Sequence, residues 1–463
     1  MNKITILGGG GVRTPLVIHG LAQARDILGL HELCLFDPDT GRAETIARMG
    51  REIVRRLDGG FTIAVQSNLD AAAEGADAVL NSIRVGGMAG RARDERLAIE
   101  HGFAGQETTG PGGAAMALRT LPVTLAYARA VERVSPSAWF INFTNPAGLM
   151  TQALAQETKL RVIGICDTPS ELFHRIGEAL GAPAADLAID YAGLNHLGWV
   201  RRVEHGGKDV TPRILADREL LRRLYPADLF DPELIQTLGL IPTEYLFFYY
   251  SQRKAYRNQV RAGASRGEEL ARMNAGLFDQ LACEDAAQAL ATYRTYLLQR
   301  NASYLKLEAE GGSAFQAAMH DYDPFETATG YHKIALDVLT GLVSEAPREV
   351  VLNVTNMNVT HLNVTHGHAI EGLLADDVVE VPCEVDRDGA RPKRTGPLPQ
   401  SIRGLVESVK QYERRLIHAS LTQSKAQARV ALMECPIVGG WEPAGEVLDA
   451  LIAADPEHLS YLR

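Results

Sequence analysis

The N-terminal segment carries the sequence feature that most restricts how this chain can fold. An apolar run, Lys3–Leu7, leads into four consecutive glycines at positions 8–11, and helical spacing begins at Pro15. A second apolar run, Glu32–Phe36, ends at Asp37. A strand, a glycine-rich turn, a helix, a second strand and an acid in this order are typical of a dinucleotide-binding fold, because the turn's N–H groups and the helix N-terminus face a pyrophosphate.

The same segment supplies the residues that we expect to contact a cofactor. Asp37 stands roughly where an acid receives the adenosine ribose hydroxyls, which favours NAD over NADP. Arg13 replaces the third glycine of the usual fingerprint, so the motif is less specific than the full fingerprint, and glycine runs also occur in ordinary turns. The predicted cofactor-binding residues are Gly8, Gly10, Gly11, Val12, Arg13 and Asp37.

Further strands and helices alternate along the first third of the chain. Apolar runs at residues 62–65, 77–83, 138–142 and 161–165 predict strands, and residues 117–134 have helical spacing. Strands separated by helices indicate a doubly wound parallel sheet of the Rossmann type, as in lactate and malate dehydrogenases. We therefore expect an α/β protein with a dinucleotide-binding domain over residues 1–165 and a C-terminal α/β catalytic and oligomerisation domain over residues 166–463.

The C-terminal half has weaker patterns. Helical spacing at residues 268–298, 402–433 and 444–454 predicts helices that pack around the sheet. Alternation over residues 350–365 predicts a strand, and it explains the histidines at positions 361, 366 and 368 better than a second metal cluster does.

Polar residues follow two of the predicted strands, and ligands gather at the carboxyl ends of such strands. After residue 83 we expect a flexible loop that carries Arg84, Arg91 and Arg93. Arginine binds phosphate or sulfonate through two parallel hydrogen bonds, although these three could equally belong to a solvated helix start. Asn145 precedes a proline that is well placed to open a helix. The glycine-rich residues 105–113 predict a backbone close to a ligand, or a mobile surface loop.

A cysteine and a histidine farther along the chain could converge on one metal site. Cys166 follows the apolar run at 161–165, and His196 lies between glycines in the segment 193–198. Thiolate and imidazole suit a borderline divalent metal, and two protein ligands would leave the other coordination positions open to substrate. The alternative is that Cys166 is a small buried side chain and that His196 has a structural role.

Composition restricts the class of protein further. The 463 residues include 46% hydrophobic residues and carry a formal net charge of −10, which argues against nucleic acid as the main partner. The five cysteines are odd in number and dispersed, which fits a reducing compartment. We recognise neither a signal sequence nor an apolar run long enough to cross a membrane, so we expect a cytoplasmic protein without membrane association.

Six motifs, taken together and in order, resemble those of glycoside hydrolase family 4, the NAD- and manganese-dependent glycosidases best known as 6-phospho-glucosidases. The resemblance covers nearly the whole chain, and the ordered set is far more specific than any single motif. The motifs lie at residues 8–15, 93–95, 105–113, 142–148, 166–169 and 193–196.

The resemblance implies that the chain binds NAD and manganese or another divalent metal, with Cys166 and His196 as metal ligands shared with sugar hydroxyls. It also implies a redox-assisted elimination, with transient oxidation at sugar C3, removal of the C2 proton and loss of the aglycone, outside the two-carboxylate rule of glycosidases. Matched motif positions make Tyr245 the base, with Tyr249 and Tyr250 as alternatives, although aromatic runs of this kind also occur in ordinary cores.

The residue after the metal cysteine bears on the substrate. Aspartate at this position is typical of the family's 6-phospho-α-glucosidases, where it protonates the departing oxygen, so the resemblance implies a catalytic role for Asp167. Residues 11–15 and 379–383 look more like the 6-phospho-β-glucosidases, so the anomer stays open. The residues expected to contact the anionic sugar are Arg84, Arg91, Arg93, Asn145 and Asn195.

Three alternatives remain at this point. A related branch of NAD-dependent enzymes hydrolyses sulfoquinovosides, which are α-linked and carry a sulfonate at C6, and an α-sulfoquinovosidase would fit Asp167. A dehydrogenase that releases NADH could use the same dinucleotide fold, but enzymes of that type use a histidine base without a metal. A non-catalytic sensor of NAD and sugar is the third. The family resemblance suggests a homodimer or a homotetramer.

Overall fold

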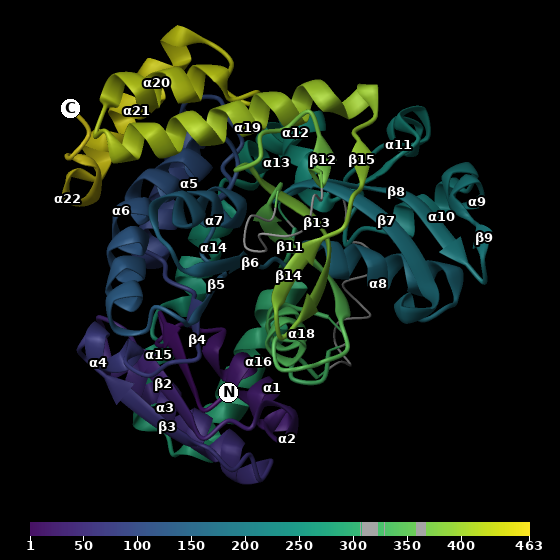
Figure 1. The fold of residues 1–463 in the computed structure, drawn as a ribbon. Helices are drawn as coiled ribbons and strands as arrows, with labels where there is room; N and C mark the ends of the chain where they lie inside the picture. Colours follow the sequence, from purple (N-terminus) through teal and green to yellow (C-terminus); the bar gives the residue numbers. More distant parts are fainter. Residues whose placement is uncertain (306, 308–322, 328, 358–366) are drawn as a thin grey trace.

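A single mixed sheet joins the N-terminal and C-terminal halves of the chain in the computed structural model (Figure 1). The structure describes residues 1–305, 307, 323–327, 329–357 and 367–463. Within these residues the sheet has 13 strands, which helices cover on both sides. The α/β class expected from the sequence is therefore confirmed.

The N-terminal half of the sheet is parallel. Its strands are β1 (Lys3–Leu7), β2 (Glu32–Phe36), β3 (Thr62–Gln66), β4 (Ala78–Asn81), β5 (Trp139–Asn142) and β6 (Arg161–Gly164). They lie in the order β3-β2-β1-β4-β5-β6, which is the order of a doubly wound dinucleotide-binding fold. Each strand expected here is present, and the chain crosses from one side of β1 to the other between β3 and β4, which opens a crevice at the carboxyl ends of the strands.

Helices alternate with these strands as expected. They are α1 (Thr14–Gln23), α2 (Arg25–Leu28), α3 (Thr40–Arg56), α4 (Leu69–Ala73), α5 (Gly87–Glu100), α6 (Gly110–Val134), α7 (Ala147–Glu157) and α8 (Thr168–Leu180). Pro15 lies in the first turn of α1, where its missing N–H has no intrahelical partner to lose. Asp39 caps α3 by accepting a hydrogen bond from the N–H of Arg42, which fixes the start of α3 just after Asp37.

The loop expected after residue 83 is helical from Gly87 onward, so that prediction was wrong, whereas the glycine-rich segment 105–113 becomes helical only at Gly110. Helix α5 begins after Gly86, whose φ of 77° ends the preceding turn, and it contains Arg91 paired with Glu95 one turn later. Helix α6 begins inside the glycine-rich segment. A Cβ atom on Gly113 would lie 2.5 Å from the backbone of Thr108, so the glycines let this helix start pack directly against residues 105–109.

The C-terminal half of the sheet is antiparallel. It contains β7 (Leu187–Leu194), β8 (Leu197–His205), β9 (Lys208–Asp209), β10 (Ile241–Pro242), β11 (Arg348–Thr355), β13 (Val378–Asp386) and β14 (Gly389–Pro392), while β12 (Ile370–Glu371) and β15 (Gly396–Pro397) form a separate pair. The sheet continues from β6 through β11, β13 and β7 to β8. The strand expected over 350–365 ends at Thr355, and residues 358–366 lie outside the described part of the chain. The domain boundary at residue 165 stays a prediction.

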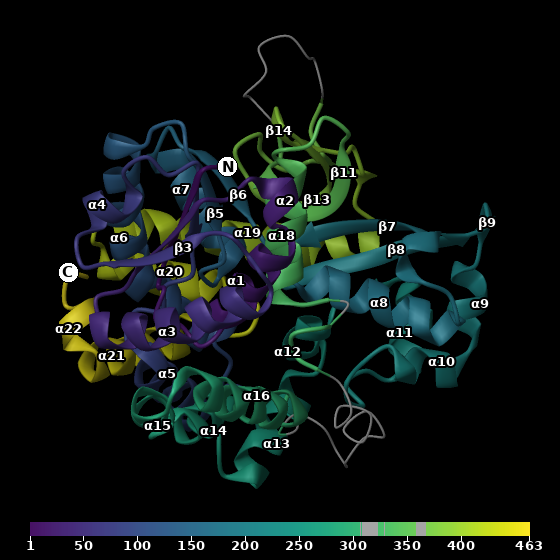
Figure 2. The ribbon, with the colours of Figure 1, turned by 90° about the horizontal axis from the view of Figure 1, so that it is seen from below.

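Short helices surround the β7–β8 hairpin, and longer ones cover the rest of the molecule. Around the hairpin lie η1 (Ala184–Asp186), α9 (Thr211–Ala216), α10 (Arg218–Arg223), α11 (Pro232–Leu238), η2 (Glu244–Leu246) and α12 (Phe247–Tyr250). The helix expected over 268–298 is split into three, which group with α13 in Figure 2: α13 (Gln252–Ala262), α14 (Arg266–Asn274), α15 (Leu277–Cys283) and α16 (Ala286–Ala302).

The C-terminal helices lie together over α5 and α6 (Figure 1). They are α19 (Gln400–Leu421), α20 (Lys425–Glu434), α21 (Trp441–Ala454) and α22 (Pro456–Leu459), and α18 (Tyr331–Gly341) packs on α1 and β11. The helix expected over 402–433 is divided between α19 and α20. None of the helices in the described ranges combines the length and the apolar character that a membrane span requires.

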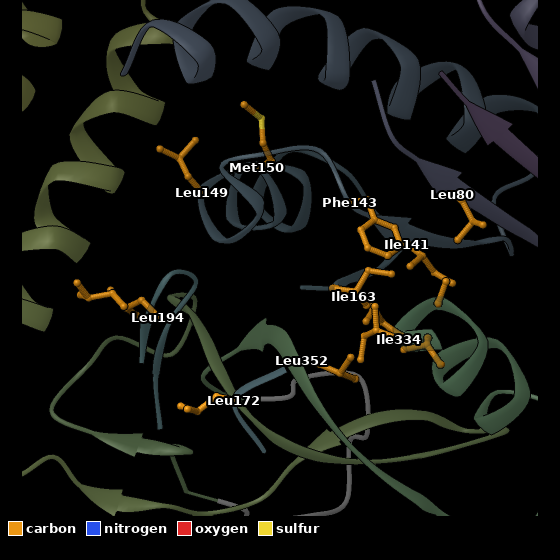
Figure 3. Packing of buried hydrophobic residues seen from close by; sticks show 14 of the residues in the cluster. Leu80, Ile141, Phe143, Leu149, Met150, Ile163, Leu172, Leu194, Ile334 and Leu352 are labelled. Atoms are coloured by element: carbon orange, nitrogen blue, oxygen red, sulfur yellow. The ribbon is translucent and has the colours of Figure 1, made fainter. Parts of the chain in front are cut away.

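One hydrophobic core extends across both halves of the sheet. Figure 3 shows Ile141 of β5 and Ile163 of β6 beside Leu352 of β11 and Ile334 of α18. Burial of apolar side chains across the β6–β11 boundary stabilises the two halves against each other. The crevice at the strand ends is therefore framed by elements from both halves.

Candidate active site

The glycine-rich turn after β1 is held by the acid that follows β2. The carboxylate of Asp37 accepts hydrogen bonds from the N–H groups of Gly10 and Asp39, both at 3.0 Å. Gly8 has a φ of 84°, and a Cβ atom there would lie 2.6 Å from the carbonyl oxygen of Ser82. This turn therefore requires glycine, and its backbone can approach a pyrophosphate closely. The arrangement fits a dinucleotide, and the role of Asp37 at the ribose stays a prediction.

The side chain of Arg13 leaves this turn and enters a cavity of about 520 Å³. The cavity lies beyond the carboxyl ends of β1 and β6 and is closed by α5, α8, α14, α16 and α18. The side chains that give it its chemistry are Arg13, Arg91, Glu107, Asp167, Glu244, Tyr245, Arg266, Arg300, Tyr331 and His332. Sequence-distant segments thus meet at the expected edge of the sheet.

Cys166 and Asp167 join the end of β6 to the start of α8. Asp167 occupies the N-cap position of α8 but its side chain does not cap the helix, so its carboxylate is available to the cavity that it lines. Cys166 is buried, and its pKa is raised well above the ordinary value by that burial and by the negative charges of Glu380 and Asp167. A thiolate here requires a nearby cation, which a divalent metal would provide.

His196 lies in the two-residue turn between β7 and β8, where Leu194 pairs with Leu197. Its φ of 59° is in the left-handed region, which is costly for a residue other than glycine. Burial lowers the pKa of His196 to about 4, against the opposing effect of Glu107 and Asp167. The imidazole is therefore neutral at pH 7, which is the form that binds a metal.

A hydrogen-bond chain fixes which nitrogen of His196 is free. The hydroxyl of Thr108 lies 2.9 Å from His196 Nδ1 and 2.8 Å from Gln106 Oε1. The amide oxygen of Gln106 can only accept, so the Thr108 hydroxyl donates to Gln106 and accepts from Nδ1–H. The lone pair of His196 then lies on Nε2, as ligation through that atom requires.

Tyr245 stacks on this histidine. The two rings are 3.8 Å apart at their centroids and 11° from parallel. Burial, Glu244 and Glu107 raise the pKa of Tyr245 far above its ordinary value, so a phenolate also depends on a nearby cation. The Tyr304 hydroxyl lies 3.5 Å from that of Tyr245 and donates a hydrogen bond to Glu244. Tyr249 and Tyr250 are absent from the cavity lining, which favours Tyr245 among the three.

Cys166 and His196 are also absent from the cavity lining, but each has a neighbour in it, Asp167 and Tyr245 respectively. In the described part of the chain no three side chains of the ligating types are arranged to hold a metal ion. A metal bound by Cys166 and His196 would therefore complete its coordination with substrate hydroxyls and water. The donor types and the neutral imidazole fit such an open site.

The three arginines expected to bind substrate have ion-pair partners. Arg84 and Arg91 lie 2.7 Å and 2.9 Å from the same oxygen of Glu107, and Arg91 also pairs with Glu95. Burial would raise the pKa of Glu107, but Arg84 and Arg91 lower it to about 2. Arg93 instead pairs with Asp455 at 2.8 Å and does not line the cavity.

The two predicted asparagines do not line the cavity either. Asn145 lies between β5 and α7, where its bond to Pro146 is cis. Asn195, next to His196 in the hairpin turn, donates a hydrogen bond to Glu380 at 3.2 Å. The roles of both in substrate binding stay predictions.

Arg300 of α16 is a site residue that was not predicted from the sequence. It lines the cavity, and burial together with the positive charges of Arg13, Arg266 and Arg91 lowers its pKa to about 10. Among the residues that the structure describes, its guanidinium has no carboxylate partner. Helical spacing could have predicted this position. Arg300 lies four residues after Tyr296 and three after Leu297, so it falls on the face of α16 that points to the interior.

Known protein families and relatives match this chain over nearly its full length. Residues 3–182 match the family described as Family 4 glycosyl hydrolase, and residues 191–438 match Family 4 glycosyl hydrolase C-terminal domain. A probable 6-phospho-beta-glucosidase of Bacillus subtilis is 28% identical, and the alignment covers 99% of this chain and 97% of the relative. Phospho-alpha-glucosidase PagL of Clostridium acetobutylicum is 26% identical over 98% of this chain and 97% of its own.

Solved structures of a family 4 relative have the same fold as this chain. The 6-phospho-beta glucosidase from Thermotoga maritima, with NAD and glucose-6-phosphate, superposes with a TM-score of 0.82 at 26% identity and covers 99% of both chains. The same enzyme has also been solved with manganese, NAD+ and glucose-6-phosphate, with a TM-score of 0.80 at 25% identity, over 99% of both chains. The two family matches together span more than nine-tenths of the sequence, and the fold and the ordered motifs agree with them. The chain therefore belongs to the family 4 glycosyl hydrolases and is a glycosidase.

Proposed function

We propose that this glycosidase uses NAD and a divalent metal to cleave 6-phospho-glucosides. One observation carries the proposal: a single cavity collects Asp167 and Tyr245, which adjoin the cysteine–histidine pair, and Arg300, which lacks an anionic partner among the described residues. The relatives support the substrate class, because both α- and β-specific phospho-glucosidases match nearly the whole chain. The Thermotoga maritima enzyme supports the cofactors.

The polar side chains of the cavity suit an elimination reaction. When bound, NAD+ and the metal would supply reversible hydride removal at sugar C3 and Lewis-acid stabilisation of the charge that develops at C2. Tyr245 removes the C2 proton, and Asp167 gives a proton to the departing glycosidic oxygen as the C1–O bond breaks. Water then adds at C1. Cys166 and His196 would hold the metal, and the raised pKa of Tyr245, which stacks on His196, makes a neighbouring cation necessary.

The anionic group of the substrate would bind at Arg300. A guanidinium buried among other guanidinium groups is costly until an anion arrives, and phosphate or sulfonate accepts its paired N–H donors. Arg13 is near enough to lower the pKa of Arg300, so a doubly charged phosphate can interact with both. This favours phosphate over sulfonate, which carries one charge.

The test is release of 4-nitrophenol from its α- and β-6-phosphoglucosides and from its α-sulfoquinovoside. Dialysed enzyme is assayed with and without NAD+ and Mn2+. We expect turnover of one phosphoglucoside that depends on both additions, and that substrate identifies the anomer. Cleavage of the sulfoquinovoside alone would replace phosphate by sulfonate. Stoichiometric NADH accumulation without nitrophenol would contradict the glycosidase mechanism and favour a dehydrogenase.

A further inference from the structure

A row of buried polar side chains crosses the sheet between the two candidate metal ligands. Asn353 of β11 lies opposite Gly164 of β6 on one side and opposite Glu380 of β13 on the other. Glu380 in turn lies opposite Gly193 of β7. These residues occupy the same level of adjacent strands, so their side chains point to the same face.

The row lies where the two halves of the sheet join. The strand pairing between β6 and β11 is registered at Asn353–Gly164, and the pairing between β13 and β7 is registered at Glu380–Gly193. Cys166 follows Gly164 by two residues, and the turn that carries His196 begins two residues after Gly193. The distance between the two ligands therefore depends on strands β11 and β13 and on how firmly they are joined at this level.

The side chain of Glu380 links this row to its neighbours through hydrogen bonds. Its carboxylate accepts hydrogen bonds from Tyr191 Oη at 2.6 Å, from Asn353 Nδ2 at 3.0 Å and from Asn195 Nδ2 at 3.2 Å. Glu380 is 1% exposed, so it has no access to bulk water. A buried carboxylate is costly unless donors surround it, and here three strands or turns supply one donor each.

Glycines provide the space that this network needs. A Cβ atom on Gly198 would lie 1.9 Å from the Tyr191 hydroxyl, and one on Gly164 would lie 2.8 Å from Cβ of Asn353. Any side chain at these two positions would displace a member of the network. The sequence thus combines a polar row with the small residues that allow it to close.

We propose that Glu380 is a positioning residue that holds the Asn195–His196 turn at a fixed distance from Cys166. The inference rests on the proposed function, since it assumes that Cys166 and His196 bind the metal. Glu380 acts through Asn195, which precedes His196 in a turn with a strained backbone, and through Asn353, which anchors β11 at the level of β6. Groups that orient metal ligands in this way typically contribute 10- to 100-fold to metal affinity.

The test is the Mn2+ affinity of Glu380→Gln, measured by isothermal titration in the presence of saturating NAD+. The amide keeps the shape but replaces one accepting oxygen by a donor, so the network cannot satisfy all three neighbours. We expect Mn2+ binding to weaken about tenfold. The affinity for NAD+ should stay within about twofold, because the turn at Gly10 and Asp37 is separate from this network.

Two further variants separate positioning from general stability. Glu413→Gln removes another buried carboxylate, one that pairs with Lys410 on the same helix, and it should lower the melting temperature while leaving Mn2+ affinity unchanged. Tyr191→Phe removes one donor to Glu380 with little change of shape, and it should weaken Mn2+ binding about threefold even if Glu380→Gln fails to fold.

The outcomes are distinct. Wild-type Mn2+ affinity in the Glu380 and Tyr191 variants would overturn the positioning role, and so would equal weakening in Glu413→Gln. If the wild type binds no Mn2+ with NAD+ present, the proposed metal site is wrong and the positioning role is wrong with it. Weaker Mn2+ binding in the Glu380 and Tyr191 variants, with the Glu413 variant unaffected, supports the inference.

Discussion

The cavity has two sides of opposite electrostatic character. On the side of β6 and the β7–β8 hairpin, burial together with the negative charges of Glu380 and Asp167 raises the pKa of Cys166, so this side disfavours a further negative charge and favours a cation. On the side of α16, desolvation together with the positive charges of Arg13 and other guanidinium groups lowers the pKa of Arg300, so this side favours an anion. A substrate with hydroxyls at one end and an anionic group at the other matches both sides.

Arginines at the cavity differ in whether a carboxylate neutralises them, and this separates structural arginines from ligand-binding ones. Arg91 also lines the cavity, but Glu107 neutralises it together with Arg84, which does not line the cavity. Buried ion pairs of this kind hold segments together and leave little capacity for a ligand. Arg300 has no carboxylate partner in the described part of the chain, so its partly buried charge can be neutralised by an arriving anion. The predictions below test each side in turn.

The largest effect is expected on the cation-binding side. Cys166→Ser replaces the thiolate by a hydroxyl that stays protonated, so Mn2+ affinity should collapse and turnover should fall roughly a thousandfold. Cys383→Ser is the control, because that thiol is also buried but lies on β13, where none of its sequence neighbours lines the cavity as Asp167 does beside Cys166. Titration with Mn2+ and steady-state kinetics measure both effects. Near-normal metal affinity in Cys166→Ser would remove the cysteine from the site.

Tyr245→Phe should lower turnover by about a hundredfold, because it removes the group that takes the C2 proton. Exchange of the substrate's C2 hydrogen with D2O, followed by NMR, reports this step directly and should stop. Metal affinity should change little, since the phenyl ring can still stack on His196. If exchange continues at the wild-type rate, the base is another residue.

On the anion-binding side, Arg300→Gln should raise KM for the phosphorylated substrate about 30-fold, or roughly 2 kcal/mol, through loss of charge-assisted hydrogen bonds. The turnover number should change little. Arg294→Gln is the matched control on the same helix, where the side chain is half exposed and pairs with Asp323. Equal effects of the two substitutions would show that Arg300 contributes only general electrostatics.

Thr108→Val tests the orientation of His196 on the cation-binding side. The substitution keeps the shape but removes the hydroxyl that accepts from Nδ1–H, so Mn2+ affinity should fall about tenfold. Thr109→Val is the control, because the Thr109 side chain makes no capping hydrogen bond in α6. Unchanged Mn2+ affinity in Thr108→Val would mean that the stack on Tyr245 alone orients the imidazole.

Much of the cation-binding side was predictable because its motifs are local. The positions of a cysteine directly after a strand and of a histidine in a tight turn are set by the adjacent sequence. Asp37 likewise follows β2 at the expected position. The same locality explains why each strand of the parallel half was expected at its place in the sequence.

The anion-binding side was not predictable in the same way, since charge compensation is a long-range property. Nothing near Arg93 in the sequence indicates Asp455, its partner on the last turns of the chain. Likewise Glu107 neutralises Arg84 and Arg91 only because α5 is a helix and residues 105–109 pack beneath it. An anion-binding site can still be indicated in the sequence by a charged residue on the apolar face of an amphipathic helix, as at Arg300.

The smallest effect concerns His332, which lines the cavity from α18. Burial lowers its pKa to about 4, and the nearby charges of Lys333 and His19 act in the same direction. The unfolded chain binds a proton here below about pH 6.5, whereas the folded protein does so only below about 4, so the free energy of unfolding should fall as the pH is lowered between these values. In urea titrations His332→Gln should reduce that slope by close to one proton, while the exposed His31→Gln should leave it unchanged. An equal slope in wild type and His332→Gln would mean that the cavity does not lower the pKa of this imidazole, because the folded and unfolded chains would then bind its proton equally.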